Sequence, residues 1–392
     1  MKIGLILANP PGYSETFFNS KINGLQENGA NVTVFAQTSN EEFKLCPVKT
    51  APKVYANPIK QLIAMGVVYL ALLPQLRRIL RYIALERQEK TAWRLVFKRI
   101  YLNAHLLKAD ADWLHFGFAT QALGSETVAK AIGAKMAVSF RGFDINAYPI
   151  KYPGCYDALW NQVDKVHSIS DDLLHKAHAL GLDKTTPNRI ITPAVNLKSL
   201  SEISNKKSKN KVLQIVTIAR LHWVKGIDLL IETAGLLKQK DVEFNWTVVG
   251  DGDQKSSERY RYHIYEKGLQ NEVTLKGQQS HSSTLQQLSD ADVYVQTSLN
   301  EGFCNAVLEA QALGKLCIAT DVGGLPENIK DATTGWLVPK NNAGKLADKI
   351  VEVVSLSDAE KVKISTAARS RVAEEFTVEK QQQQFVKFYS EA

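Results

Sequence analysis

One stretch decides the fold, Asn300-Glu301-Gly302-Phe303-Cys304-Asn305-Ala306-Val307-Leu308-Glu309-Ala310. An apolar run at 293–297 precedes it and predicts a buried strand, and an apolar pattern from Asn305 to Leu313 predicts a helix. Asn305 is a favourable N-cap residue, and Gly314 stands at a position where helices commonly end. A strand, a glycine-containing turn and a helix in this order form the unit from which parallel α/β sheets are built.

The same alternation of short apolar runs and helical patterns extends along the chain in both directions. Strands are predicted at 3–8, 32–36, 113–116, 136–140, 166–170, 213–219, 244–250, 273–275, 293–297, 316–320 and 336–338. Helices are predicted at 17–28, 120–132, 227–239, 256–267, 283–288, 305–313, 342–355, 358–376 and 378–390. We therefore expect an α/β fold with two Rossmann-like, doubly wound parallel-sheet domains facing a cleft. In such sheets, ligands bind outside the carboxyl ends of the strands.

The length of the chain and one polar stretch indicate how the domains divide. The 392 residues suit two domains better than one ordinary core. A polar, lysine-rich stretch at 199–210 is typical of a linker. We predict a first domain at 1–198 and a second at 211–375. A C-terminal helix within 376–392 is expected to pack back on the first domain.

The composition is that of a globular protein with a basic balance. Hydrophobic residues make up 45% and charged residues 22%, and the net charge is +8. Between Arg77 and Lys108, nine basic residues stand against two acidic ones, so this segment accounts for nearly all the excess. A basic balance indicates an anionic partner, such as a phosphate-bearing substrate, nucleic acid or an acidic membrane. The confinement of the charge to one segment, without a nucleic-acid motif, argues against nucleic acid.

Cysteine spacing and hydropathy bear on further classes. The four cysteines are widely spaced without a CxxC pair, so neither a disulfide framework nor a metal site is predicted. The apolar opening is broken by Asn9-Pro10-Pro11-Gly12, which predicts a first buried strand instead of a signal peptide, and hence a cytoplasmic protein. The longest apolar run, at 62–73, is too short to span a bilayer.

Two glutamates flank the predicted start of the 305–313 helix. The turn and the first helical residues present backbone N–H groups and a partial positive charge, which suit a phosphate. Glu301 lies on the turn, and Glu309 lies about 6 Å further along the helix axis. The two carboxylates could bind hydroxyl groups on either side of a diphosphate. The alternative, two solvated surface glutamates, stays open from spacing alone.

A second cluster, Ala219-Arg220-Leu221-His222-Trp223-Val224-Lys225-Gly226, follows the first strand of the second half. Arg220 and Lys225 are expected at the carboxyl end of that strand, at the same sheet edge as the two glutamates. Fixed cations there would neutralise a departing diphosphate; a basic surface turn is the alternative. Gly250 and Gly252 end the next strand and would allow a ligand to approach the backbone closely.

Together these motifs resemble the family 4 retaining glycosyltransferases of the GT-B fold, also called group 1. The resemblance rests on the motifs around Arg220 and Glu301, on Gly250-Asp251-Gly252 and on Val322-Gly323-Gly324, and it covers essentially the whole second half. It implies a nucleotide-sugar donor, with UDP or GDP, and transfer of a hexosyl unit with retention. It further implies that no metal or cofactor takes part.

The resemblance also implies roles for individual residues. Arg220 and Lys225 would hold the donor diphosphate, and Glu301 would contact the transferred sugar. These three would act in catalysis, and Glu309 would bind the ribose. The other donor-binding residues that the family implies are Gly12, Gly250, Gly252, Gln278, Gly302, Phe303, Cys304 and Asn305.

The first half resembles the exopolysaccharide and O-antigen transferases of this family more loosely. Residues 11–17 match the P-x-x-S-E-T-F opening of that subgroup. Many relatives have a catalytic or sugar-binding histidine where this chain has Arg141, and arginine cannot act as a base. Either Arg141 contacts phosphate or a sugar hydroxyl and acts in catalysis, or the role moves elsewhere. His115 and Asp144 are candidates for the acceptor side, although a strand-end histidine is more often structural.

The segment 59–108 mixes apolar and basic residues at helical spacing. Such a segment binds peripherally to an anionic membrane, here at its inner face, or covers a sheet with a solvated basic face; both stay open. The acceptor implied by the family is a glycan or lipid-linked glycan of cell-surface polysaccharide or lipopolysaccharide biosynthesis. The alternatives are a non-catalytic sugar-nucleotide-binding partner subunit and a transferase similar to glycogen or starch synthase.

Overall fold

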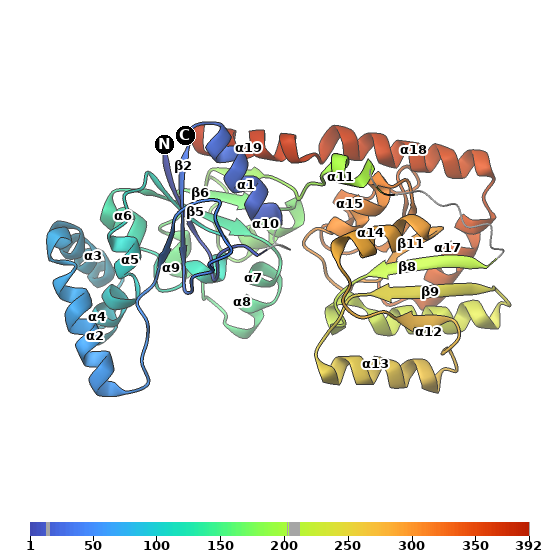
Figure 1. Cartoon of the computed structure of the whole chain (residues 1–392), viewed down its shortest axis with the longest axis horizontal. Helices are drawn as coiled ribbons and strands as arrows, with labels where there is room; N and C mark the ends of the chain where they lie inside the picture. The colour runs from blue at the N-terminus through green and yellow to red at the C-terminus, as the bar shows by residue number, and fades with distance from the viewer. Residues whose placement is uncertain (13–15, 202, 204–211, 392) are drawn as a thin grey trace. The chain divides into compact units, whose positions relative to one another are not determined.

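The computed structural model describes residues 1–12, 16–201, 203 and 212–391. The chain forms two compact units, one containing 1–191 and 381–392 and the other containing 192–380 (Figure 1). Most of the predicted linker at 199–210 lies outside the described residues. The strands of each unit form one parallel sheet, which confirms the predicted α/β class with two doubly wound sheets.

The first unit is built on a seven-stranded parallel sheet. Its strands are β1 (Lys2–Ile6), β2 (Asn31–Ala36), β3 (Val48–Thr50), β4 (Trp113–Phe116), β5 (Lys135–Phe140), β6 (Lys165–Ser168) and β7 (Asn188–Ile190). They lie in the order β3-β2-β1-β4-β5-β6-β7, with all pairs parallel. The order reverses between β1 and β4, so the carboxyl ends of these two strands form the switch point of the sheet.

Helices surround this sheet, and one predicted helix is wrong. They are α1 (Thr16–Glu27), α2 (Pro58–Leu70), η1 (Leu73–Gln75), α3 (Leu76–Gln88), α4 (Trp93–Leu102), α5 (Ala104–Leu107), η2 (Ala119–Ala122), α6 (Val128–Ile132), α7 (Phe143–Asn146), α8 (Tyr148–Lys151), α9 (Asp157–Trp160), α10 (Asp171–Ala179) and α19 (Val378–Ser390). The predicted helix at 120–132 is two pieces, η2 and α6. Gly124 lies between them with φ +80°, a left-handed conformation that interrupts a helix.

The last helix of the chain completes the core of the first unit. Phe385, Phe388 and Tyr389 of α19 are at most 4% exposed and pack in one cluster with strand and α1 residues such as Ile3 and Ile22. Figure 1 shows both ends of the chain on this unit. The core of the first unit therefore combines its first and last residues.

The second unit repeats the architecture with six strands. They are β8 (Leu213–Ile218), β9 (Phe244–Val249), β10 (Val273–Leu275), β11 (Val293–Gln296), β12 (Leu316–Thr320) and β13 (Trp336–Val338), in the parallel order β10-β9-β8-β11-β12-β13. Its helices are α11 (Leu197–Ser201), η3 (Trp223–Lys225), α12 (Ile227–Gln239), α13 (Gln254–Glu266), α14 (His281–Asp290), α15 (Asn305–Ala312), α16 (Leu325–Asn328), α17 (Ala343–Ser355) and α18 (Asp358–Glu375). The switch point lies between β8 and β11.

A densely packed core holds the second sheet between its helices. Trp246 on β9 is 1% exposed and Leu230 on α12 is completely buried. The Trp246 indole donates a hydrogen bond to Thr217 Oγ1 at 3.0 Å, so its one polar atom is satisfied. Burial of each such side chain stabilises the fold by about 1.5–3 kcal/mol, which gives the loops at the switch point a rigid base.

Candidate functional site

The loops that follow β8 and β11 meet at the carboxyl edge of the second sheet. β8 and β11 are hydrogen-bonded neighbours, so the residues after them are adjacent although they are some 80 positions apart in the sequence. The Leu299 amide donates to the Val224 carbonyl at 2.8 Å, and the Thr297 hydroxyl donates to the Lys225 carbonyl at 2.9 Å. These bonds bring the predicted cationic loop and the predicted acidic loop together in one place.

Several glycines of the motifs let neighbouring loops touch. Gly226 has φ +65°, and a Cβ there would lie 2.0 Å from the Thr297 carbonyl oxygen; Gly323 has φ +53°, and a Cβ there would lie 2.1 Å from the Glu301 carbonyl oxygen. Both positions therefore exclude any side chain. In this structure the close approach is between loops of the protein itself.

The glycines after β9 play a similar part. A Cβ at Gly250 would lie 2.2 Å from the Ala219 carbonyl oxygen, and a Cβ at Gly252 would lie 2.4 Å from the Leu221 carbonyl oxygen. The predicted donor-binding residues Gly250 and Gly252 thus pack against the loop of Arg220. Their lack of side chains allows the loop of Arg220 to lie directly against the loop that follows β9.

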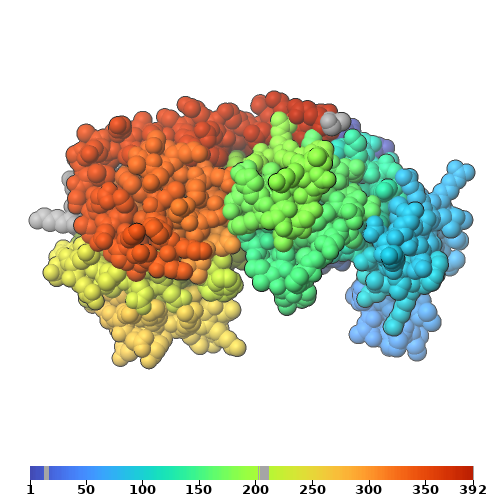
Figure 2. Space-filling model, turned by 180° about the vertical axis from the view of Figure 1, so that it is seen from behind, coloured from blue at the N-terminus to red at the C-terminus, as the bar shows by residue number. Residues whose placement is uncertain are grey.

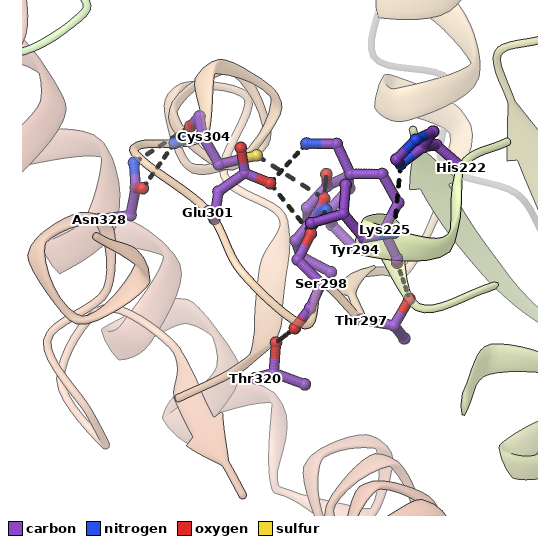
Figure 3. Close-up of polar contacts among 11 residues, drawn as sticks. His222, Lys225, Tyr294, Thr297, Ser298, Glu301, Cys304, Thr320 and Asn328 are labelled. Atoms are coloured by element: carbon purple, nitrogen blue, oxygen red, sulfur yellow. Dashed lines mark hydrogen bonds and ion pairs between the residues drawn. The ribbon is translucent and has the colours of Figure 1, made fainter. Parts of the chain in front are cut away.

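Lys225 and Glu301 form an ion pair at the centre of this edge. The Lys225 Nζ lies 2.5 Å from Glu301 Oε2, and the two side chains are only 17% and 12% exposed. Figure 3 shows the amine of Lys225 pointing at the carboxylate of Glu301. Because the pair is largely shielded from water, its attraction is stronger than that of a surface pair.

A chain of buried polar groups supports Glu301 from below. The Tyr294 hydroxyl donates to Gln296 Oε1, the Gln296 amide donates to Ser298 Oγ at 2.7 Å, and Ser298 Oγ donates to Glu301 Oε2 at 3.0 Å. All three supporting side chains are at most 1% exposed. Burial raises the pKa of Tyr294 well above its usual value, so its hydroxyl remains a donor.

The sequence reasoning missed this supporting chain, although a signal was present. Tyr294, Gln296 and Ser298 stand at alternate positions, so they point to the same face of β11 and its extension. Polar residues on the buried face of a strand need partners. Their presence predicts a hydrogen-bonded network that ends at the next polar group, which is Glu301.

The start of α15 differs from the prediction in one detail. The N-cap residue is Cys304, with extended backbone angles, and Asn305 is the first helical residue and exposed. The prediction of Asn305 as the N-cap is therefore wrong. The side chain of Asn328 binds Cys304 instead, accepting from its amide at 2.9 Å and donating to its carbonyl at 3.1 Å. Gly314, at φ +72°, follows the helix as predicted.

The side chains of Phe303 and Cys304 point into the protein. Phe303 is 6% exposed and packs against Phe376 with ring centroids 5.8 Å apart. The Cys304 thiol contacts Gln296 Oε1 at 3.7 Å, and burial raises its pKa to about 12. Any contact of the 302–305 turn with a ligand is therefore made by its backbone or by Asn305.

Glu309 has a partner that the sequence reasoning did not name. His281, at the start of α14, donates to Glu309 Oε1 at 2.9 Å. The Glu309 side chain is 18% exposed and that of His281 is 55% exposed. The hydrogen bond to Glu309 raises the pKa of His281 above its ordinary value. The alternative of two solvated surface glutamates does not hold, because both Glu301 and Glu309 are largely enclosed and paired.

Arg220 and Gln278 are exposed, as Asn305 is. Arg220 follows β8 directly, and Gln278 follows the turn at Gly277 after β10. Gly277 forms an isolated bridge with Gly250, which holds that turn beside the glycine loop. Both side chains are thus positioned by the sheet edge and can reach a ligand above it.

The acceptor-side candidates of the first unit are buried. His115 is completely buried, and its ring nitrogens lie 2.6 Å from the Tyr389 hydroxyl and 2.8 Å from Ser139 Oγ. Asp144 is also buried, and its carboxylate accepts from the amides of Ala119, Arg141 and Gly142. The expectation that these side chains face an acceptor is corrected: His115 lies in the core, and Asp144 holds the turn after β5.

The guanidinium of Arg141 stacks on aromatic rings. Its guanidinium carbon is 3.9 Å from the ring centre of Phe17 and 4.6 Å from that of Phe18, and the residue is half-buried. Gly12 accepts a hydrogen bond from Asn19 at 3.3 Å. Residues 13–15 of the matched opening motif lie outside the described residues. Stacking fixes the cation of Arg141 at the carboxyl edge of the first sheet, after β5.

Comparison with known proteins agrees with this geometry. Residues 200–371 match the family model of glycosyl transferases group 1. The chain is 30% identical over 286 residues to the amylovoran biosynthesis glycosyltransferase AmsK of Erwinia amylovora, covering 70% of this chain and 68% of that protein. It is 28% identical over 279 residues to the putative colanic acid biosynthesis glycosyltransferase WcaL of Escherichia coli (strain K12), covering 69% and 67%.

The fold is shared with a solved structure. The structure of Anabaena Alr3699/HepE in complex with UDP and glucose superposes with a TM-score of 0.73 at 17% identity, covering 100% of both chains. That likeness shows the GT-B fold. With the matches to the group 1 model and to the amylovoran enzyme, it leads to one conclusion: this chain belongs to the group 1 glycosyltransferases and is homologous to transferases of exopolysaccharide biosynthesis.

Proposed function

We propose that this chain is a family 4, retaining hexosyltransferase that uses a UDP- or GDP-sugar and needs neither metal nor cofactor. The acceptor in this proposal is a glycan or lipid-linked glycan of cell-surface polysaccharide biosynthesis. The observation that carries it is the enclosed Lys225–Glu301 pair at the switch point of the second sheet. A cation, an acid and the start of α15 lie together there, where such sheets bind nucleotides.

The diphosphate of the donor is assigned to Arg220, Lys225 and the first amides of α15. As the bond between the sugar C1 and the phosphate oxygen breaks, its electron pair and negative charge remain on the leaving diphosphate. Fixed cations and helix amides stabilise that charge more in the transition state than in the ground state. The acceptor hydroxyl forms the new bond to C1 from the same face, and its proton passes to the leaving phosphate.

The transferred sugar is assigned to Glu301. Both of its side-chain contacts with described residues, to Lys225 and to Ser298, use Oε2. Oε1 is therefore the oxygen that we assign to a sugar hydroxyl. The Tyr294–Gln296–Ser298 chain keeps the carboxylate in place before the donor arrives, and such preorganisation lowers the reorganisation cost of the reaction.

The remaining donor contacts follow from the loops around this pair. Glu309 is assigned to the ribose hydroxyls and Gln278 to the base, since both are positioned by the sheet edge of the second unit. Backbone groups of the 302–305 turn are assigned to the sugar and the phosphate. From the first unit, we assign Gly12 to the donor and Arg141 to phosphate or a sugar hydroxyl. We also place the enzyme at the inner face of an anionic membrane, contacted by the basic segment 59–108.

A panel of nucleotide sugars tests the proposal in two steps. A bound donor stabilises only the native state, so the right UDP- or GDP-sugar should raise the unfolding temperature more than the others. The same donor should then release its nucleoside diphosphate, and the product's anomeric configuration should match the donor's. Chelator should leave the rate unchanged. Binding without turnover would point to a non-catalytic partner subunit, and inversion would refute retention.

A further inference from the structure

The helix α2 exposes an apolar stripe to solvent. No residue of α2 is buried. Six apolar side chains here are each between 59% and 71% exposed, and we call them the apolar ridge: Ile59, Leu62, Ile63, Val67, Leu70 and Leu73. Their spacing of three, four and seven positions places those of α2 on one side of the helix. A continuous exposed apolar surface of this kind usually marks a site that binds another protein or a membrane.

The ridge continues onto the next helix beside a row of cations. Leu76 and Leu80 of α3 are 51% and 58% exposed, and Arg77 and Arg81 follow each of them directly and are also exposed. Figure 2 shows this part of the chain, coloured light blue to cyan, as a protruding lobe of the first unit. Apolar and cationic side chains thus share one exposed surface.

The exposed charge of the segment 77–108 is strongly positive, because most of its basic residues face solvent and one of its two acids does not. Seven of the nine basic residues at 77–108 are exposed: Arg77, Arg81, Arg87, Lys90, Arg94, Lys98 and Lys108. The acidic Glu86 is 1% exposed and paired with Arg99 at 2.7 Å, so Glu89 is the exposed acid among these described residues. A partner of this surface must therefore provide both an apolar region that can bury the ridge and negative charge that can pair with the cations.

We propose that the apolar ridge inserts into the interfacial layer of an anionic lipid bilayer, with the cations of α3 and α4 at the phosphate groups. This deepens the membrane contact included in the proposed function, which a basic face alone could make without insertion. A second copy of the chain would fit the apolar residues but would bring two strongly cationic surfaces together. Anionic lipid satisfies both properties at once.

Exposed side chains of α4 and of the segment before α2 have the chemistry of residues that lie among lipid headgroups. Trp93 on α4 is 53% exposed, and the guanidinium of Arg87 lies 4.9 Å from its ring centre. Tyr55, before α2, is 37% exposed. Tryptophan, tyrosine and arginine combine apolar bodies with polar ends and favour the boundary between lipid and water.

The way α3 is anchored favours insertion along the surface over crossing. Among the described residues, no single helix has the length and hydropathy of a membrane span; α2 combined with 73–88 meets the criteria, with a bend of 53°. Tyr82 and Leu85 of α3 are buried in the first unit, and Arg78 donates to the carbonyls of Leu107 and Ala109. Since α3 is fixed to the protein, α2 can lie in the interface beside it.

Flotation of the full chain with vesicles tests the insertion. Vesicles of phosphatidylglycerol and phosphatidylethanolamine should bind the protein, and vesicles of phosphatidylcholine should bind it weakly. The variant Leu62→Asp/Val67→Asp should lose binding by at least about tenfold, because charge opposes insertion. The matched control Ile150→Asp changes another exposed apolar residue of the same unit, 80% exposed, and should bind normally.

Two further readouts keep this idea separate from the proposed chemistry. An environment-sensitive dye attached to a cysteine introduced at 62 should shift to the blue on binding anionic vesicles, whereas a dye at 150 should not. Donor hydrolysis without vesicles should be equal in all variants, and its loss in every variant would concern the proposed function instead. Vesicle binding that is unchanged in the aspartate variant, or a ridge-dependent dimer seen by sedimentation without lipid binding, would overturn the insertion.

Discussion

The carboxyl edge of the second sheet and the apolar ridge of the first unit are built in opposite ways. At the edge, the charges of Lys225 and Glu301 are withdrawn from water and paired. On the ridge, apolar side chains such as Leu62 are left in water, 71% exposed. Burial of charge at the edge and exposure of apolar side chains on the ridge are both unfavourable. In each region, a bound partner can lower that cost. The edge is suited to a small anion, and the ridge to an extended apolar phase.

Mutation of one large apolar residue in each region should give the widest difference. Trp246→Ala empties a core site and should lower the free energy of unfolding by about 3–5 kcal/mol. Leu62→Ala should change it by less than about 0.5 kcal/mol, because the side chain is already exposed. Urea unfolding followed by circular dichroism measures both. Equal losses would show that the ridge is packed in solution.

Removal of the cation at the edge should affect turnover more than folding. Lys225→Ala should lower kcat by about 10²–10³-fold, since one preorganised contact to the developing charge is lost. Steady-state release of nucleoside diphosphate measures the effect. Lys238→Ala is a matched control, because Lys238 is also paired with a carboxylate but is 47% exposed. Similar rates in the two variants would remove Lys225 from the chemistry.

The buried chain behind Glu301 should have an intermediate effect. Ser298→Ala leaves the Gln296 amide without its acceptor and Glu301 without one donor, at a cost of about 1–3 kcal/mol. We expect a fall in kcat of about tenfold with a smaller change in donor KM. Ser298→Thr keeps the hydroxyl and should recover part of the rate. Ser355→Ala, which removes an exposed hydroxyl of the second unit, serves as the control.

The His281–Glu309 pair should give the smallest effect, and one that depends on pH. Glu309 raises the pKa of His281 above 6.5, so the charged pair stabilises the fold below that value. The contribution is lost as the pH rises through the raised pKa of the folded state. His281→Gln should therefore be less stable than the wild type at low pH and equal to it at high pH. The difference at low pH should be about 0.2–1 kcal/mol, because His281 is 55% exposed and water screens the pair. Unfolding across the pH range measures this difference, and a constant gap would contradict it.

The strands of the second sheet could be predicted from the sequence almost to the residue. β10, β12 and β13 begin and end as predicted. β12 is buried along its whole length, and such a strand is a continuous apolar run with polar ends. The edge strands β3 and β7 were missed. Each has three residues that are exposed or only partly buried, so neither shows an apolar run.

The candidate site was predictable in its members but less so in its contacts. Motif spacing placed the Arg220 and Glu301 loops at one edge because parallel strands end together. It could not show that Lys225 would pair with Glu301, or that His281 would pair with Glu309, since those contacts depend on side-chain directions across strands. Nor could spacing show that the apolar ridge of α2 faces solvent. An amphipathic helix has the same sequence pattern whether its apolar side packs on a core or faces outward.

The closing of the first unit by α19 has a consequence for biosynthesis. The ribosome delivers residues 1–191 long before Phe385, Phe388 and Tyr389, which fill the same cluster as Ile3 and Ile22. During that interval the apolar surface that α19 will cover is exposed on the nascent first unit. Chaperones can bind it, and so can non-native apolar segments. The second unit, 192–380, is contiguous and can complete its own core first, so the N-terminal half of this enzyme should be the last part to mature.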